Sequence, residues 1–316
     1  MDRRAWTLLL VLSAIWGASY MFIEIGLRDI GPAAIAFVRV ALGAAVLVPI
    51  AVLRGELGGL RGGLGVIAAV AAVQAAGPFL LIGLGQEEIS SSLAGILVSS
   101  TPIFTALLAI WVDHEERSTG LRLLGVLIGF AGVVILLGLD LGGSGAALLG
   151  GSAVLLASFG YAVGGFVAKQ KLFETPPIGL AAAVMIASTV LLAPAAVIDA
   201  PGGLPGAGPI AAVGALGLLG TGVAFAIFFE LIGRVGPAKA FVVTYLASAF
   251  ALGYGVVLLG EPLTVGAVLG LVLIVAGSWL AAEGRLNGRP LQQPGAAPAQ
   301  SDSAPRRARH VAHQES

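Results

Sequence analysis

The sequence lacks cysteine, so disulfide bonds and thiolate metal sites are excluded from its 316 residues. Charged residues are scarce at 11%, and the three histidines, His114, His310 and His313, stand outside the long apolar stretches. The HExxH, GxGxxG and GxxxxGK[ST] patterns of metal and nucleotide sites are also missing. The sequence therefore lacks the residues and motifs that membrane enzymes commonly use for catalysis. We predict no catalytic residue, no cofactor and no metal.

Apolar residues, in contrast, make up 58% of the chain, and the mean hydropathy is +1.00, far from the values of a soluble domain. A helix needs about 20 mostly apolar residues to cross a bilayer. Ten such stretches predict spans at 5–26, 33–53, 64–84, 92–112, 121–139, 146–168, 178–198, 209–231, 238–259 and 264–283. The predicted fold class is an all-α integral membrane protein with ten transmembrane helices.

Basic residues are distributed unequally between the two sides of these spans. Lysine and arginine near span ends mark the cytoplasmic face. One side holds Arg3, Arg4, Arg54, Arg61, Arg117, Arg122, Lys169, Lys171, Arg234, Lys239, Arg285 and Arg289. The other side holds one basic residue, Arg28, beside Asp29, Glu87, Glu88, Asp140, Asp199 and Glu261. We therefore predict a protein of the cytoplasmic membrane with both termini in the cytoplasm.

Residues 284–316 differ in composition from the rest of the chain. They are rich in proline, glutamine, alanine and arginine and have no apolar period, which is typical of a disordered segment. We predict a disordered cytoplasmic tail. Its "RRAR" run could contact anionic lipid, or it could be a solvated part of that tail.

An internal repeat becomes visible when the sequence is compared with itself at a shift of 145 residues. Pro32 then meets Pro177, Pro49 meets Pro194, and Thr119 meets Thr264. Residues 1–140 and 141–283 are therefore predicted to be two five-span units. Since five is odd, the second unit enters the membrane from the opposite side, and the halves are inverted repeats.

Several stretches resemble one known family. "LSAIWGASYMFIEIGL" followed by "PAAIAFVRVALGAAVL" is similar to the opening of the EamA-like branch of the drug/metabolite transporter superfamily. "RVGPAKAFVVTYLASAFALGYGVVLLGEPLTVGAVLGLVLIVAGSWL" is similar to the last two spans of that family. The resemblance implies ten helices, a central cavity between the halves, alternating access, and export of small metabolites such as amino acids. Two positions depart from the family pattern, with Glu24 where lysine is common and Ser248 where proline is common.

Arg39 is a charge inside an otherwise apolar span, about 9 Å below the outer edge at 1.5 Å per residue. Such a residue requires a partner or an aqueous path. Three interpretations are open. Arg39 can pair with Glu24 as a structural or gating ion pair, extend to the lipid head groups, or bind an anionic group of the substrate.

Glu230 is the other acid within a span and lies near its cytoplasmic end. It can pair with Lys169 or Lys171 at the same level, or stand hydrated beside Arg234. The spans have no acid at mid-depth, so a proton relay at the membrane centre has no obvious carrier.

Polar and aromatic residues at mid-depth are the candidates for substrate binding, because pockets combine apolar walls with a few directed hydrogen bonds. They are Trp16, Tyr20, Gln74, Ser100, Thr101, Tyr161 and Tyr245. Ser100 and Thr101 precede Pro102, which frees backbone groups of its helix. The alternative is that the hydroxyls bond to their own helix and the aromatic rings fill packing gaps.

The combined interpretation is a secondary active transporter that exports a small metabolite, an amino acid or a related compound. A facilitative channel and a non-transporting scaffold or receptor are the alternatives. The expected partners are the substrate and the lipid bilayer, with no nucleic acid. Gly125-xxx-Gly129 and Gly266-xxx-Gly270 permit close helix approach, so we expect packing within the chain, and a monomer or weak homodimer.

Overall fold

The computed structural model describes residues 1–58, 63–112, 120–141, 144–172 and 174–283. The described residues form helices and connecting turns, and no strand occurs among them. The predicted tail, residues 284–316, lies outside the described residues.

Ten membrane spans follow one another along the chain, as predicted. Five are built as single helices or nearly so: α1 (Arg3–Gly26), α2 (Pro32–Leu53), α8 (Gly145–Lys171), α9 (Pro177–Ile198) and α14 (Val265–Glu283). The others combine α3 (Leu64–Ala71), η2 (Ala72–Ala76) and α4 (Gly77–Gln86); α5 (Ser91–Val98) and α6 (Thr101–Val112); α7 (Gly120–Leu136) and η3 (Leu137–Leu141); α10 (Ala207–Gly217), η4 (Leu218–Val223) and α11 (Ala224–Val235); and α12 (Pro237–Ala240) and α13 (Val242–Leu258). Eight are long and apolar enough to cross a bilayer, and α13 and α14 are shorter apolar helices.

Local chemistry explains where several helices begin. The side chains of Asp2, Ser90 and Ser144 accept hydrogen bonds from the first turns of α1, α5 and α8, as N-cap residues do. Pro32 and Pro177 stand in the first turns of α2 and α9, where proline loses no helical hydrogen bond.

The two halves have matching local structure. The bounds of α2 and α9, Pro32–Leu53 and Pro177–Ile198, are related by the same shift of 145 residues found in the sequence, and each helix contains one inner proline, Pro49 or Pro194. The π-helical segments η2 and η4 interrupt the third span of each half near corresponding positions. The structure thus agrees with the repeat that the sequence predicts.

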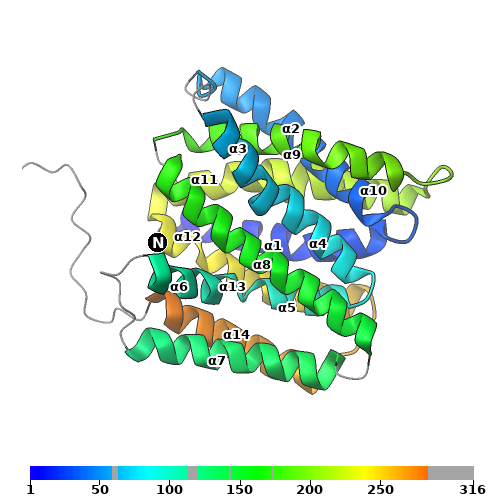
Figure 1. Ribbon diagram of the computed structural model, residues 1–316, viewed down its shortest axis with the longest axis vertical. Coiled ribbons are helices and arrows are strands. Elements are labelled where there is room, and N and C mark those ends of the chain that lie inside the picture. Colours follow the sequence, from blue (N-terminus) through cyan, green and yellow to red (C-terminus); the bar gives the residue numbers. More distant parts are fainter. Residues whose placement is uncertain (59–62, 113–119, 142–143, 173, 284–316) are drawn as a thin grey trace, which may run out of the picture. The chain divides into compact units, whose positions relative to one another are not determined.

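The helices pack as a bundle whose edges are pairs drawn from opposite halves. In Figure 1, α7 and α14 lie side by side along one edge, and α2 and α9 lie together at the other, with α1 and α8 between them. Apolar side chains cover the outward faces of the edge helices, including Leu127, Phe130 and Val134 of α7 and Val190 of α9. Exposed apolar faces of this kind suit contact with lipid.

Glycine lines the contact between α7 and α14. A Cβ atom added at Gly277 would meet the backbone of Gly125 and Gly129, and one added at Gly270 would meet Leu136. The small residues therefore let these two backbones approach within the chain, as expected for the Gly125-xxx-Gly129 and Gly266-xxx-Gly270 spacings.

Candidate substrate site and the contacts at the two ends

Arg39 lies buried in the bundle, with 8% of its surface exposed. Its Nε donates a hydrogen bond to Thr221 Oγ1 at 3.0 Å, and its guanidinium carbon lies 3.7 Å from the centre of the Phe79 ring. Thr221 belongs to η4 and Phe79 to α4. Three spans, two from the first half and one from the second, therefore hold this cation.

Arg39 and Glu24 do not form the ion pair that the sequence suggested. The salt bridges found among the described residues belong to Glu230, whereas the Glu24 carboxyl lies within reach of Gln86. Depth explains the difference, since Arg39 is seven residues inside α2, about 10 Å, and Glu24 is two residues from the end of α1, about 3 Å. The part of the chain that the structure describes provides no counter-ion for Arg39.

Two of the tyrosines proposed from the sequence for substrate binding lie close to this cation. Tyr20 of α1 and Tyr161 of α8 are both electrostatic neighbours of Arg39. The Tyr161 ring also meets Phe79 edge-on, with 6.4 Å between ring centres. Tyr20, Arg39 and Tyr161 were candidates from the sequence, while Phe79 and Thr221 were missed, because an apolar ring and a single threonine carry no distinguishing pattern. We name these five residues the arginine cluster.

Trp16 lies one turn from Tyr20 on α1 but belongs to a different aromatic group. Its ring centre is 5.1 Å from that of Phe228 and 6.2 Å from that of Phe225. Gln74 lies in η2, where a Cβ added at Gly164 of α8 would touch it. Tyr245 is partly buried on α13. Trp16 and Gln74 are therefore not part of the immediate surroundings of Arg39, which are formed by Thr221, Phe79, Tyr20 and Tyr161.

Ser100 and Thr101 stand at the break between α5 and α6, and their hydroxyls bond to backbone. Ser100 Oγ donates to Leu97 O at 2.7 Å and Thr101 Oγ1 to Val98 O at 2.8 Å. Val98 O is the acceptor that Pro102, having no N–H, leaves without its helical donor. The hydroxyls therefore satisfy the broken helix, which is the structural alternative considered for them.

Hydroxyls from other spans complete this break. Ser248 Oγ of α13 donates to Gly95 O at 2.9 Å, and Ser278 Oγ of α14 donates to Ser99 O at 2.9 Å. Ser158 Oγ of α8 reaches Leu97 O at 3.3 Å. Backbone groups inside a membrane must find partners within the protein, and here serine supplies them. Ser248 is thus a structural donor.

Glu230 pairs with arginine at the end of the bundle that holds the N-terminus. Its carboxylate lies 2.9 Å from Arg4 and 3.1 Å from Arg234. Both acid and bases are substantially exposed, so the ion pair adds little stability. The structure agrees with the hydrated interpretation beside Arg234 and supplies Arg4, rather than Lys169 or Lys171, as the second partner.

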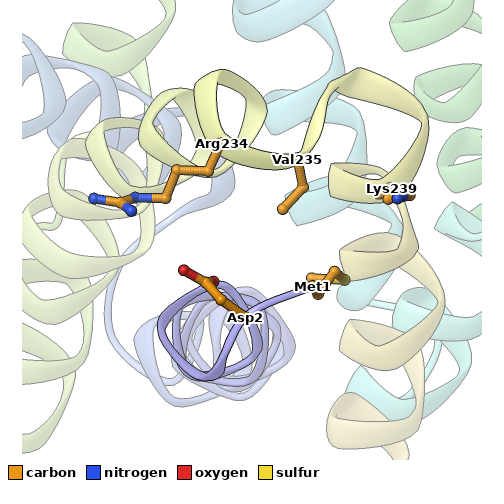
Figure 2. A pocket seen from close by; sticks show the side chains of 5 residues that line it. All are labelled: Met1, Asp2, Arg234, Val235 and Lys239. Carbon is orange, nitrogen blue, oxygen red and sulfur yellow. The ribbon is translucent and has the colours of Figure 1, made fainter.

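A pocket opens beside this ion pair. Figure 2 shows Arg234 and Val235 on one side of it, Met1 and Asp2 on the opposite side, and Lys239 at its margin. Three of its five lining residues, Asp2, Arg234 and Lys239, carry a charge, and the pocket lies at the end of the bundle. It therefore differs from an apolar substrate chamber. None of the predicted substrate-binding residues lines it.

Carboxylates at the opposite end hold the starts of helices. Asp199 Oδ2 accepts from the N–H of Ala33 at 2.7 Å, and Asp29 Oδ2 accepts from the N–H of Gly206 at 2.7 Å. Glu261 accepts from the N–H and hydroxyl of both Ser91 and Ser92. We call this the acidic end. Burial, then Asp199 and Glu88, raise the pKa of the Glu87 carboxyl in the same region.

The chain folds as a ten-span bundle of two repeated halves around the buried Arg39. The chain belongs to the EamA-like transporter family, whose sequence profile matches residues 4–138 and 148–282. The two matches coincide with the two halves of the bundle. Among the relatives, the uncharacterized inner membrane transporter YedA of Escherichia coli (strain K12) is 30% identical over 264 residues, which are 81% of this chain and 83% of YedA.

Two other relatives have more specific names. The probable amino-acid metabolite efflux pump of Escherichia coli (strain K12) is 26% identical and covers 89% of this chain and 95% of its own length. The probable terminal-alkyne amino-acid exporter of Streptantibioticus cattleyicolor is 27% identical, covering 89% and 93%. A crystal structure superposes with a TM-score of 0.64 at 19% identity, over 89% of this chain and 97% of the other, and this likeness shows the fold alone.

Proposed function

We propose that the protein is a secondary active transporter that exports a small carboxylate-bearing metabolite, an amino acid or a related compound, across the cytoplasmic membrane by alternating access. The observation that carries the proposal is the buried Arg39 guanidinium, which has no acidic partner among the described residues. Two relatives named for amino-acid export support the same class of substrate.

The chemistry of the arginine cluster suits a carboxylate. Burying a charge without a partner costs on the order of several kcal/mol, and a bound anion would remove that cost. Of the donors of Arg39, Nε is used by Thr221, so the two terminal nitrogens are available for the bidentate contact that guanidinium makes with carboxylate. Phe79, Tyr20 and Tyr161 supply an aromatic wall for an apolar part of the substrate.

The repeat supports alternating access. The antiparallel helices α2 and α9 are each capped by the acid that follows the other, Asp199 at Ala33 and Glu56 at Gly179. If one half rocks against the other, the contact at one end of this helix pair would break while the contact at the other end persists, and then the reverse. In this proposal the end with Arg4 and Arg234 faces the cytoplasm, because basic residues gather there.

The substrate class can be tested in two steps. Cells that overproduce the protein are challenged with toxic concentrations of each L-amino acid, and the protective cases are followed by counterflow of the radiolabelled compound in proteoliposomes. L-phenylalanine and phenethylamine form a matched pair that differs by the carboxylate. We expect saturable counterflow of one or more L-amino acids and none of the matching amine.

Three results would contradict parts of this proposal. Equal counterflow of L-phenylalanine and phenethylamine would contradict the proposed contact between Arg39 and the carboxylate of the substrate. Flux that rises linearly with concentration would indicate a channel instead of a carrier. Absence of flux for every amino acid, in protein that is folded and inserted, would favour the scaffold or receptor alternative.

A further inference from the structure

Three buried side-chain oxygen atoms have no hydrogen-bond partner among the described residues. One is Oδ2 of Asp140. The other two belong to the contact between α1 and α4: Oε2 of Glu24, near the end of α1, and Oε1 of Gln86, the last residue of α4. Gln86 is 4% exposed, and its side chain lies within hydrogen-bonding reach of the Glu24 carboxyl. Buried acceptors without donors are uncommon in folded proteins and are costly.

Gln86 cannot supply what is missing. Its Nε2 already donates to the backbone oxygen of Tyr20 at 2.9 Å, which leaves one further N–H for the Glu24 carboxylate. The contact between α1 and α4 therefore has four acceptor oxygens: both of the Glu24 carboxylate, Gln86 Oε1 and the backbone oxygen of Tyr20. The two N–H groups of Gln86 are the donors that they share. Rotating the amide by half a turn would turn Gln86 Oε1 toward the Tyr20 oxygen and produce the same deficit.

We propose that Glu24 and Gln86 form a proton-binding site, and that the proton bound there lets α1 close against α4 at the acidic end. A proton on Oε2 makes the Glu24 carboxyl neutral and turns that oxygen into a donor for Gln86 Oε1. One proton thus satisfies both orphaned oxygens. When it leaves, a buried carboxylate without sufficient donors favours separation of the two helices.

The neighbouring charges direct the proton to Glu24. The charged groups that face it are Arg28, exposed one turn further along the chain, and Glu261, in the segment before α14. Glu261 accepts hydrogen bonds from the N–H and the hydroxyl of both Ser91 and Ser92, so its carboxylate has four donors. Glu24 has at most one donor, the second N–H of Gln86, so it is the neighbouring acid whose carboxylate lacks donors for its charge.

A proton fits this site better than a metal cation does. The orphaned atoms are two oxygens, whereas calcium takes six to eight oxygen ligands and magnesium about six. Among the described residues there is also no group of three or more acids or histidines that could hold a metal ion. The site stands on these contacts alone, and only its consequence for transport rests on the proposed function.

Protonation can be observed without any substrate. Infrared difference spectra of the purified full-length protein, recorded along a pH titration, report the C=O stretch of a protonated carboxyl. We expect a band in the wild type that persists to higher pH than the bands of exposed acids and is missing from Glu24→Gln. Glu88→Gln, which removes an exposed acid from the same end, should keep it. An unchanged band in Glu24→Gln would overturn the proposal.

Closure can be measured by thiol labelling, because the chain has no cysteine of its own. Ile82→Cys reports from the buried face of α4, where Ile82 is 2% exposed, and Gly203→Cys reports from the exposed loop at the same end. The ratio of their rates with an impermeant maleimide removes the pH dependence that the two thiols share, and the same ratio in the Glu24→Gln background accounts for the remainder. We expect this ratio to rise with pH by at most about tenfold per unit, because one proton is involved.

In the Glu24→Gln background the same ratio should stay low at every pH, since glutamine is neutral and offers an N–H to Gln86. A ratio that still rises with pH in this variant would contradict the proposal, and a ratio that follows sodium concentration at constant pH would replace the proton by a cation. For transport, we expect Glu24→Gln to lose export driven by a pH gradient and to retain amino-acid counterflow. If Glu24→Gln lost both gradient-driven export and counterflow while its labelling ratio stayed as expected, the proton site would have no specific role in coupling. If the wild type itself showed no counterflow, the proposed function would be refuted, but the proton-binding site would still be supported by the spectra and the labelling.

Discussion

Asp199, the residue after α9, accepts a hydrogen bond at 2.7 Å from the backbone N–H of Ala33 near the start of α2. The reciprocal contact lies at the other end of the same helix pair, where Glu56, shortly after α2, accepts from the N–H of Gly179 near the start of α9 at 2.9 Å. Each helix therefore ends beside the acid that caps its partner. A carboxylate at a helix N-terminus satisfies free N–H groups and opposes the helix dipole.

These reciprocal caps predict similar losses of stability. Asp199→Ala and Glu56→Ala should each lower the stability of the detergent-solubilised protein by about 1 kcal/mol. The two sites lie at opposite ends of α2, so the double variant should show the sum. Thermal unfolding measures both, with Glu87→Gln as a control that removes an exposed acid without a cap. A double variant no less stable than either single variant would show that the caps are not independent.

The close contact of α7 and α14 predicts an unequal response of two glycines. Gly277→Ala should destabilise the protein by about 1–3 kcal/mol, because the added Cβ meets the backbone of Gly125 and Gly129 and overpacks the contact. Gly253→Ala on α13 meets nothing within 4 Å and should be neutral or stabilising by up to about 1 kcal/mol. Thermal unfolding of the two variants side by side is the measurement. Equal effects would mean that α7 and α14 are not closely packed in solution.

The break between α5 and α6 predicts a role for a distant hydroxyl. Ser248→Ala removes the donor to Gly95 O and should cost about 1 kcal/mol, the usual size of a hydrogen bond between membrane helices. Thr105→Ala is a suitable control, since its exposed hydroxyl bonds within its own helix. Thermal unfolding would show the Ser248 variant melting lower. Equal melting of the two variants would mean that water or another group replaces the serine.

The sequence predicted the ten spans and their repeat because both depend on local features. Apolar stretches of spanning length and prolines at span starts, such as Pro32 and Pro177, do not require knowledge of distant contacts. The partner of Arg39 was not predictable in this way. Thr221 is 182 positions along the chain and lies in a π-helical turn, which alters the register of side chains along the span.

Depth was the other quantity that the sequence did not resolve. Glu24 and Arg39 are close in sequence and opposite in charge, which favoured a pair. Their helices place them at different levels, and Gln86 of a third span takes the position beside Glu24. Among the hydroxyl candidates, Ser100 and Thr101 were correctly located at the helix break, but only the hydrogen-bond geometry assigns them to backbone.

The aromatic candidates outside the arginine cluster predict a loss of transport without a loss of insertion. Trp16→Ala or Tyr245→Ala should lower the counterflow of the amino acid selected by the toxicity screen, because each removes an aromatic wall at mid-depth. Trp279→Ala, which changes an exposed aromatic residue on α14, controls for a general effect of losing a ring. Membrane content of each variant is measured on the same preparations. Full counterflow in the Trp16 and Tyr245 variants would withdraw both residues from the substrate site.

Arg39 predicts a graded loss of counterflow that depends on both charge and shape. Arg39→Lys keeps the positive charge but loses the planar fork that binds carboxylate at two points, so we expect partial activity. Arg39→Ala removes the charge and the contact with Phe79, and should suppress counterflow more strongly. Thr221→Ala keeps the charge and removes the hydrogen bond that orients it, so its activity should lie nearer to that of Arg39→Lys. Arg54→Ala, at an exposed position, controls for a change of net charge. Equal counterflow in Arg39→Ala and Arg54→Ala would show that the buried guanidinium serves the fold rather than the substrate.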